Sequence, residues 1–148
     1  MPAYVQNRKA HFNFEFIEEF EAGAVLFGHE VKAIRAGQAS LAGSYVLIRG
    51  GEAFLVGASI SPYQVANTPK DYDPERPRKL LLSRKELAKL ERESEQSRLT
   101  IVPISWYSKN GKVKLRVALA RGKKKQDKRE TLKERDTKRD LQRILKSQ

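Results

Sequence analysis

The chain contains no cysteine among its 148 residues, which excludes disulfide bonds and thiolate metal sites. It has only two histidines, His11 and His29, and neither stands in a metal-binding spacing. No run of about 18 apolar residues could span a bilayer, and the start MPAYVQNRKA lacks the apolar stretch of a signal peptide. We therefore expect a cytoplasmic protein that has no metal site and no membrane partner.

Glycine-rich phosphate loops are also missing, since neither G-x-x-x-x-G-K-[ST] nor G-x-G-x-x-G occurs. We therefore expect no nucleotide cofactor and no nucleotide-dependent enzyme. A ribonuclease that uses His11 and His29 as acid and base is an alternative. Nothing in the sequence places these two side chains near each other, so we expect no catalytic residues.

Positive charge is abundant, with 30 lysines and arginines against 18 acidic residues and a formal net charge of +12. The last 28 residues, 121–148, hold twelve basic and five acidic side chains and no aromatic residue. They contain too few large apolar residues to form a core. We therefore expect residues 1–120 to form one domain and residues 121–148 to form a basic tail that is disordered when free. Such a tail fits a polyanion, most simply nucleic acid. The alternative is a solvated tail that only aids solubility.

Short alternating runs predict a mainly β fold. Phe12, Phe14 and Phe16 alternate with polar residues, as in a strand with one buried face. Gly50-Gly51 and Asn110-Gly111 each lie between β-rich runs and indicate hairpins. After the second turn, apolar and basic residues alternate, so one face packs and the other forms a basic ladder of Lys112, Lys114 and Arg116.

Helix signals are fewer. Val31 and Ile34 indicate a short helix that ends at Gly37, and Ser83 with Glu86 forms a capping box that starts another. Prolines at 62, 69, 74 and 77 exclude regular structure in the long loop that follows the Gly50-Gly51 hairpin. Five or six strands joined by hairpins predict a small antiparallel OB-like β-barrel, closed or nearly closed, with flanking helices. Barrels of this kind often bind oligonucleotides, although fold alone does not establish function.

Several motifs follow one another in a fixed order along nearly the whole chain. They are Glu21-Ala22-Gly23, Gly28-x-Glu30-Val31-Lys32-x-x-Arg35-Ala36-Gly37, Arg78-Lys79-Leu80-Leu81-Leu82, and Gly122-Lys123-Lys124 followed by Asp127-Lys128-Arg129. In this order and at these spacings the chain resembles the small protein B family, the tmRNA-binding proteins of bacterial trans-translation. A ribosomal protein or another OB-type translation factor would show the same basic barrel without this set of motifs.

The resemblance implies a non-enzymatic protein without a cofactor that binds the tRNA-like domain of tmRNA (SsrA RNA), and no DNA. It implies delivery of alanyl-tmRNA to stalled ribosomes, where peptides are tagged and ribosomes rescued. The tail is then expected to become helical in the empty mRNA channel beside the decoding centre of the small subunit. Elongation factor Tu and alanyl-tRNA synthetase are implied as partners through the shared tmRNA.

The resemblance also assigns residues, position by position. It implies an RNA surface of Asn7, Arg8, Glu21, Lys32, Arg35, Lys79, Leu81, Lys123 and Lys124. It implies a ribosome-binding tail with Asp127, Lys128, Arg129, Lys133, Arg135, Lys138 and Arg139. For Glu21 the alternative is a strand acid that faces water, for Leu81 it is a place in the core, and for the basic ladder it is a solvated face.

Overall fold

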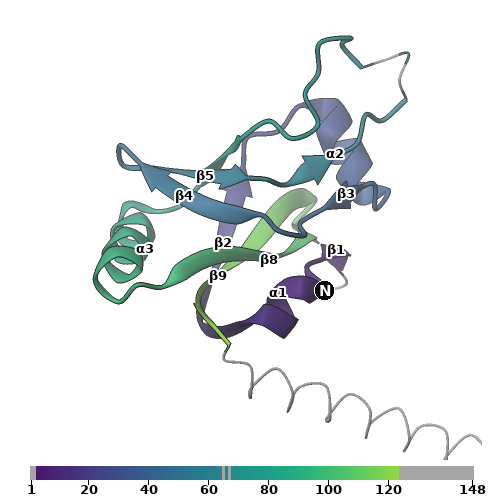
Figure 1. Cartoon of the computed structure of the whole chain (residues 1–148). Coiled ribbons are helices and arrows are strands. Elements are labelled where there is room, and N and C mark those ends of the chain that lie inside the picture. Colours follow the sequence, from purple (N-terminus) through teal and green to yellow (C-terminus); the bar gives the residue numbers. More distant parts are fainter. Residues whose placement is uncertain (1–2, 65, 67, 124–148) are drawn as a thin grey trace, which may run out of the picture.

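A strongly curved antiparallel sheet with helices around it makes up the described part of the chain (Figure 1). The computed structural model describes residues 3–64, 66 and 68–123. Within these residues the elements are β1 (Ala3–Gln6), α1 (Arg8–Asn13), β2 (Phe14–Ala24), α2 (Gly28–Arg35), β3 (Ala39–Ser40), β4 (Tyr45–Arg49), β5 (Glu52–Val56), β6 (Ser59–Ile60), β7 (Arg78–Leu81), α3 (Arg84–Gln96), β8 (Thr100–Lys109) and β9 (Lys112–Gly122).

The main sheet has seven strands in the order β1-β8-β9-β2-β7-β5-β4, and β3 pairs with β6 in a separate small sheet. The main sheet folds over a single large core, because Leu55 of β5, Leu80 of β7 and Trp106 of β8 belong to one buried cluster. Among the described residues no hydrogen-bonded ladder joins the end strands β1 and β4, but β4 lies against β8, so the sheet curls into a barrel without closing it fully. The predicted mainly antiparallel fold with flanking helices is confirmed.

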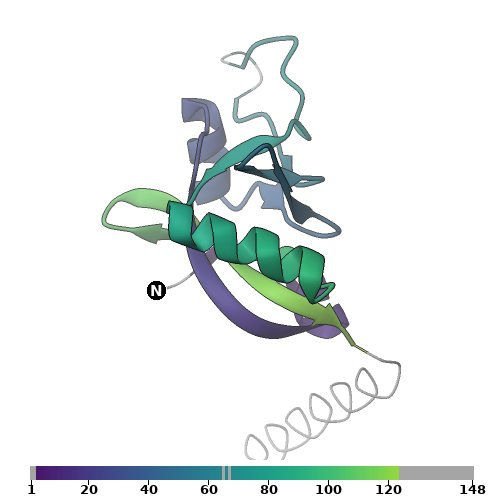
Figure 2. The ribbon, with the colours of Figure 1, turned by 90° about the vertical axis from the view of Figure 1, so that its left-hand side faces the viewer.

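Helix α3 lies along one side of the curved sheet (Figure 2). Its Leu90 is fully buried in the large core. The predicted capping box starts this helix, since the Glu86 backbone N–H donates to Ser83 Oγ at 3.2 Å and the Ser83 N–H donates to Glu86 Oε1 at 3.3 Å. Because each side chain satisfies a free backbone donor of the first turn, the helix begins sharply after Ser83.

Both predicted hairpins are present. Gly50 and Gly51 have φ of 62° and 74°, and Asn110 and Gly111 have φ of 53° and 77°. A two-residue turn with positive φ at both positions matches the twist of the flanking strands, and glycine and asparagine adopt this backbone most easily. The turn residues therefore fix the register of β4 against β5 and of β8 against β9.

The N-terminal segment differs from the prediction. Phe12 lies in α1 and not in the strand with Phe14 and Phe16, which belong to β2. The reason is Asn7, whose side chain caps α1 by accepting a hydrogen bond from the Ala10 N–H at 3.2 Å. The nine strands in the described part also exceed the expected five or six, because β1, β3 and β6 are too short to leave a periodic pattern.

Strand β9 carries the predicted alternation. Leu115 and Val117 point into the large core, whereas Lys114 and Arg116 lie on the outer face. On that outer face, Ala118 and Ala120 belong to a second small cluster with Ala10 of α1. Helix α1 therefore covers one end of the outer face of β8, β9 and β2 and leaves the other end open. Because β9 continues to Gly122, the expected domain boundary after residue 120 falls inside a strand.

Candidate RNA interface

The uncovered end of this outer face, which we call the open face, gathers several of the predicted RNA residues. Its cross-strand pairs are Leu81 with Gly23, Glu21 with Arg116, and Lys114 with Tyr107. A Cβ at Gly23 would lie 3.3 Å from Leu81 Cβ and 3.7 Å from Lys114 Nζ. Since Gly23 has no side chain, Leu81 and Lys114 approach each other across it. The open face thus combines the Glu21 carboxylate with several bases and one exposed leucine.

Glu21 is the acid at the centre of the open face. Its Oε1 accepts a hydrogen bond from the Tyr107 hydroxyl at 2.7 Å, and its Oε2 accepts one from Lys109 Nζ at 3.1 Å. The hydrogen bond from Tyr107 and the one from Lys109 lower the pKa of Glu21. Burial and the Glu21 carboxylate raise the pKa of Tyr107 to about 12. At neutral pH a fixed carboxylate therefore stands beside a protonated phenol.

The Glu21 carboxylate lines a hollow of the open face. The other lining residues are Ala3, Ser105, Tyr107, Lys109 and Arg116. The Arg116 guanidinium lies 5.2 Å from the centre of the Tyr107 ring, within the range of a cation–π contact. Each carboxylate oxygen has a second acceptor position, so Glu21 can accept from a base amino group or a ribose hydroxyl. Lys109 and Arg116 supply the cations that a neighbouring phosphate needs.

A second hollow adjoins the first one. It is lined by residues of β2, α2, β7 and the turn between β8 and β9, among them Gly23, Arg35, Leu81, Lys112 and Lys114. Arg35 Nη2 donates to the Gly111 carbonyl at 2.8 Å, so the side chain bridges α2 to the β8–β9 turn. Its remaining N–H groups stay available, because the residue is exposed. The structure thus places Arg35 and Leu81 at this hollow and Glu21 at the other one.

Leu81 is 53% exposed, whereas its neighbour Leu80 is 3% exposed and lies in the core. The alternative that Leu81 is a core residue is therefore wrong. Lys79 lies two residues away on the same side of β7, and its Nζ is 3.1 Å from Glu52 Oε1 in an exposed ion pair. An exposed ion pair contributes little to the stability of the fold, and Lys79 can pair with another anion instead. Lys32 is also exposed, on α2.

The remaining predicted residues that the structure describes lie around α1, at the covered end of the same face. Asn7 is 4% exposed, and its Nδ2 donates to the carbonyls of Leu41 at 3.2 Å and Pro103 at 2.8 Å. Arg8 follows on the helix surface. Lys123 Nζ donates to the His11 carbonyl at 3.1 Å, and the Lys123 N–H donates to the Asn13 carbonyl at 2.8 Å. Asn7 is thus placed to position α1, and Arg8 to meet a ligand.

The predicted residues beyond Lys123 cannot be compared with the fold. Lys124 and the tail residues Asp127, Lys128, Arg129, Lys133, Arg135, Lys138 and Arg139 lie outside the described residues. Their assignment stays a prediction.

The two histidines pack against different aromatic neighbours. The His11 ring lies 4.8 Å from the Phe16 ring, and the His29 ring lies 4.7 Å from the Tyr72 ring. They belong to α1 and α2, respectively, which does not favour a two-histidine ribonuclease site. In residues 3–64, 66 and 68–123 no group of three or more acidic or histidine side chains could hold a metal ion, and no helix is long and apolar enough to cross a membrane.

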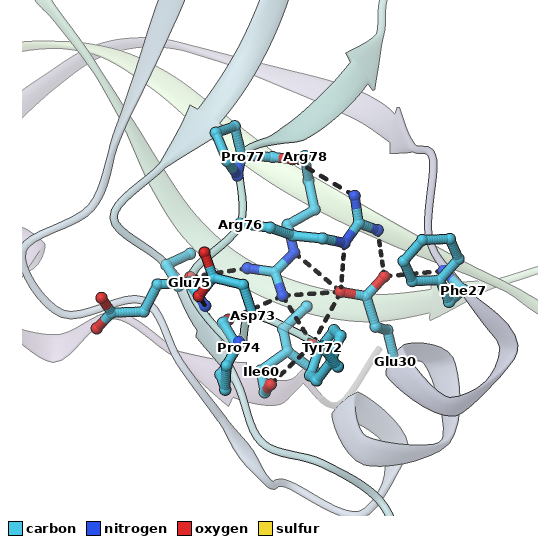
Figure 3. Close-up of polar contacts among 11 residues, drawn as sticks. Phe27, Glu30, Ile60, Tyr72, Asp73, Pro74, Glu75, Arg76, Pro77 and Arg78 are labelled. Atoms are coloured by element: carbon cyan, nitrogen blue, oxygen red, sulfur yellow. Dashed lines mark hydrogen bonds and ion pairs between the residues drawn. The ribbon is translucent and has the colours of Figure 1, made fainter. Parts of the chain in front are cut away.

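A buried ion network was not predicted. Glu30 is fully buried and accepts hydrogen bonds from Arg76, Arg78, Tyr72 and the Phe27 N–H (Figure 3). Arg78, also fully buried, lies 2.7 Å from Glu30 Oε2 through Nη2 and donates through Nη1 to the Ala58 carbonyl at 2.8 Å. The network fastens the proline-containing segment before β7 to α2, the helix that carries Lys32 and Arg35.

Protonation of Glu30 gives a pH prediction. Burial alone would raise the pKa of Glu30, but hydrogen bonds from Arg76, Phe27 and Arg78 lower it from 4.5 to about 2. The unfolded chain therefore takes up this proton first, and the folded state should lose about 3 kcal/mol as the pH falls from 4.5 to 2. Urea unfolding at pH 7, 4 and 3 should show a steeper loss in the wild type than in Glu30→Gln, and equal slopes would contradict the assignment.

Comparison with known proteins places this geometry in a family. The family model described as SmpB protein matches residues 4–147. The chain belongs to the SmpB protein family. It is 51% identical to the SsrA-binding protein of Gloeothece citriformis over 140 residues, which are 95% of this chain and 90% of that protein. It is 48% identical to the SsrA-binding protein of Burkholderia vietnamiensis over 143 residues, 97% of each.

Solved structures agree with this family assignment. A chain in the structure "tmRNA-SmpB: a journey to the center of the bacterial ribosome" matches with a TM-score of 0.67 and 41% identity. The match covers 81% of this chain and 84% of that chain. The SmpB fold and the sequence motifs of this chain therefore point to the same family.

Some residues of the site escaped sequence reasoning. Tyr107 and Lys109 hold Glu21 from 86 and 88 residues away, and no local pattern links them. Glu30 and Arg78 did belong to the motifs, but they stand 48 residues apart, so the motifs alone did not pair them. Only the fold separates these structural charges from the exposed charges of the open face.

Proposed function

We propose that this SmpB-family chain binds the tRNA-like domain of tmRNA through the open face and acts in trans-translation, without catalysis. The proposal rests on the fixed Glu21 carboxylate among Lys109, Lys114 and Arg116, in a chain whose relatives are SsrA-binding proteins. Phosphate contacts alone would need only cations. An acid held in their midst adds an acceptor for base or ribose donors, which favours one folded RNA over bulk polyanions.

We also propose the finer partners. The bound RNA would be delivered, as alanyl-tmRNA, to stalled ribosomes in the cytoplasm, with elongation factor Tu and alanyl-tRNA synthetase acting on the same RNA. Residues 124–148, which carry Lys128, Arg129 and most of the tail charge, would enter the empty mRNA channel near the decoding centre. Bound mRNA would exclude the tail sterically, because the mRNA already occupies the space and the rRNA surface that the tail would contact.

Gel shifts test the RNA preference directly. The full chain and a chain ending at residue 122 are titrated with tmRNA and with bulk rRNA fragments at several salt concentrations. We expect a clear preference for tmRNA that survives the truncation, with a smaller salt dependence because fewer phosphates are neutralised. Equal affinity for both RNAs would favour a general OB-type translation factor instead.

Replacing Glu21 with glutamine should weaken tmRNA binding about tenfold, because a charge-assisted acceptor is lost while the shape is kept. Binding to bulk rRNA fragments should not weaken, since removal of a negative charge does not harm phosphate contacts. The measurement is the ratio of the two Kd values by filter binding. A matched control is Glu95→Gln, which removes an exposed carboxylate from α3, outside the open face. An unchanged ratio in Glu21→Gln would contradict the role of Glu21.

A further inference from the structure

The outer side of the β4–β5 hairpin carries an apolar block that we call the hairpin face. It consists of Tyr45 and Leu47 on β4 and Val56 and Phe54 on β5, which stand directly opposite each other in pairs. Tyr45 is 44% exposed and Leu47 is 42% exposed. Since cross-strand neighbours lie about 5 Å apart, the four side chains form one continuous patch.

The hairpin face is separate from the core. The intervening residues Val46, Ala53 and Leu55 point inward and belong to the large buried cluster. Neither buried cluster of the described residues includes the four side chains of the hairpin face. β4 is also an end strand of the sheet. An exposed apolar patch on an end strand promotes aggregation when nothing binds to it. We therefore infer that the hairpin face binds a ligand.

The charges at the turn end and on the β7 side of the patch indicate what kind of ligand it fits. Arg49 stands at the turn end of β4, and Lys79 of β7 stands directly opposite Phe54. Glu52 lies between these two cations and forms the exposed pair with Lys79. Two aromatic rings on a sheet surface with cations beside them match the way that strand faces hold unpaired nucleotides.

The hairpin face is also continuous with the open face. In the sheet order, β7 lies between β5 and β2, and its outward residues are Lys79 and Leu81. Leu81 stands opposite Gly23, beside Glu21 on the open face. A strand spacing of about 4.8 Å places the hairpin face only a few strand widths from Glu21. One RNA that occupies the open face therefore reaches the hairpin.

We propose that the hairpin face binds unpaired bases of the same tmRNA, with the Tyr45 ring and the Phe54 ring as stacking surfaces. Arg49 and Lys79 contact the adjoining phosphates, and Lys79 exchanges Glu52 for RNA. This proposal rests on the proposed function and adds a second contact region to it. In this proposal the Tyr45 ring increases RNA affinity by stacking on a base. Stacking does not depend on counterion release.

Binding of the full chain to transcribed tmRNA tests the proposal. Tyr45→Ala should raise the Kd about tenfold, whereas Tyr45→Phe should stay within about twofold because the ring is kept. The slope of log Kd against log salt should be the same in the wild type and Tyr45→Ala, because no phosphate contact is removed. Ile17→Ala is the matched control, since Ile17 is 46% exposed on β2 and outside the hairpin face. Thermal unfolding checks that every variant folds.

The outcomes separate this proposal from the proposed function. If the wild type prefers tmRNA but Tyr45→Ala binds equally well, the hairpin proposal is wrong and the proposed function stands. If the wild type has no preference for tmRNA, the proposed function itself fails. Retained tmRNA affinity combined with lost self-association in sedimentation would assign the hairpin face to a second copy of the chain and overturn the RNA assignment. A tenfold loss rescued by phenylalanine supports stacking.

Discussion

Glu30→Ala should lower the free energy of unfolding by about 3–5 kcal/mol, because it removes one partner of a buried ion network. Arg78 would remain fully buried with two fewer hydrogen bonds to a carboxylate, and Arg76 would lose its anchor. Urea unfolding at pH 7, followed by circular dichroism, measures this change. Because α2 and the segment before β7 are joined by these contacts, we also expect weaker tmRNA binding.

Glu52→Ala is the matched control for this experiment. It removes a carboxylate that also pairs with a base, but the Glu52 side chain is 49% exposed and the Lys79 side chain 45%. An exposed pair of this kind is worth about 0–1 kcal/mol, so the variant should unfold nearly like the wild type. Similar stabilities for Glu30→Ala and Glu52→Ala would show that the buried network does not stabilise the fold.

Replacing both Lys128 and Arg129 with alanine should abolish peptide tagging while leaving tmRNA affinity within about threefold of the wild type, because only two peripheral charges are lost. We expect this separation since the body residues that form the open face are untouched. The two residues lie in the tail, outside the described residues, and their role is part of the proposed function. Tagging on stalled ribosomes in a reconstituted translation system gives the first quantity, and filter binding gives the second.

An equal loss of charge elsewhere controls this double variant. Arg84 and Lys85 are exposed at the start of α3, and their replacement with alanine removes the same net charge. The Arg84→Ala, Lys85→Ala chain should tag normally. A parallel loss of tmRNA affinity and tagging in the tail variant would instead place Lys128 and Arg129 on the tmRNA surface.

Local signals predicted the parts of the fold whose causes are local. Gly50-Gly51, Asn110-Gly111 and Ser83 each specify their turn or cap through their own backbone and side-chain chemistry. α1 was missed because it has six residues and depends on Asn7, whose amide binds a carbonyl 96 residues away. Strand β1 is recognisable only once β8 is in place beside it.

The residues of the site likewise fall into those that the sequence predicted and those that only the fold reveals. The motif resemblance placed Glu21, Arg35 and Leu81 on one surface, and the fold places Arg35 and Leu81 at one hollow and Glu21 at the other one. It did not separate the buried Asn7 from the exposed Arg8, because adjacent polar residues carry no sign of burial. The ion pairs of Glu30 span 46 and 48 residues, so only the folded structure reveals them.

Strand β9 fixes the distance between the open face and the end of the described chain. Arg116 on the open face and Lys123 beside α1 belong to one continuous stretch of chain, held to β2 and then to the Asn13 carbonyl. Seven residues at about 3.4 Å each set these two points roughly 24 Å apart. Wherever an RNA fixes the open face, the position of Lys123 is fixed as well, so the chain leaves the described body at one defined place relative to that RNA.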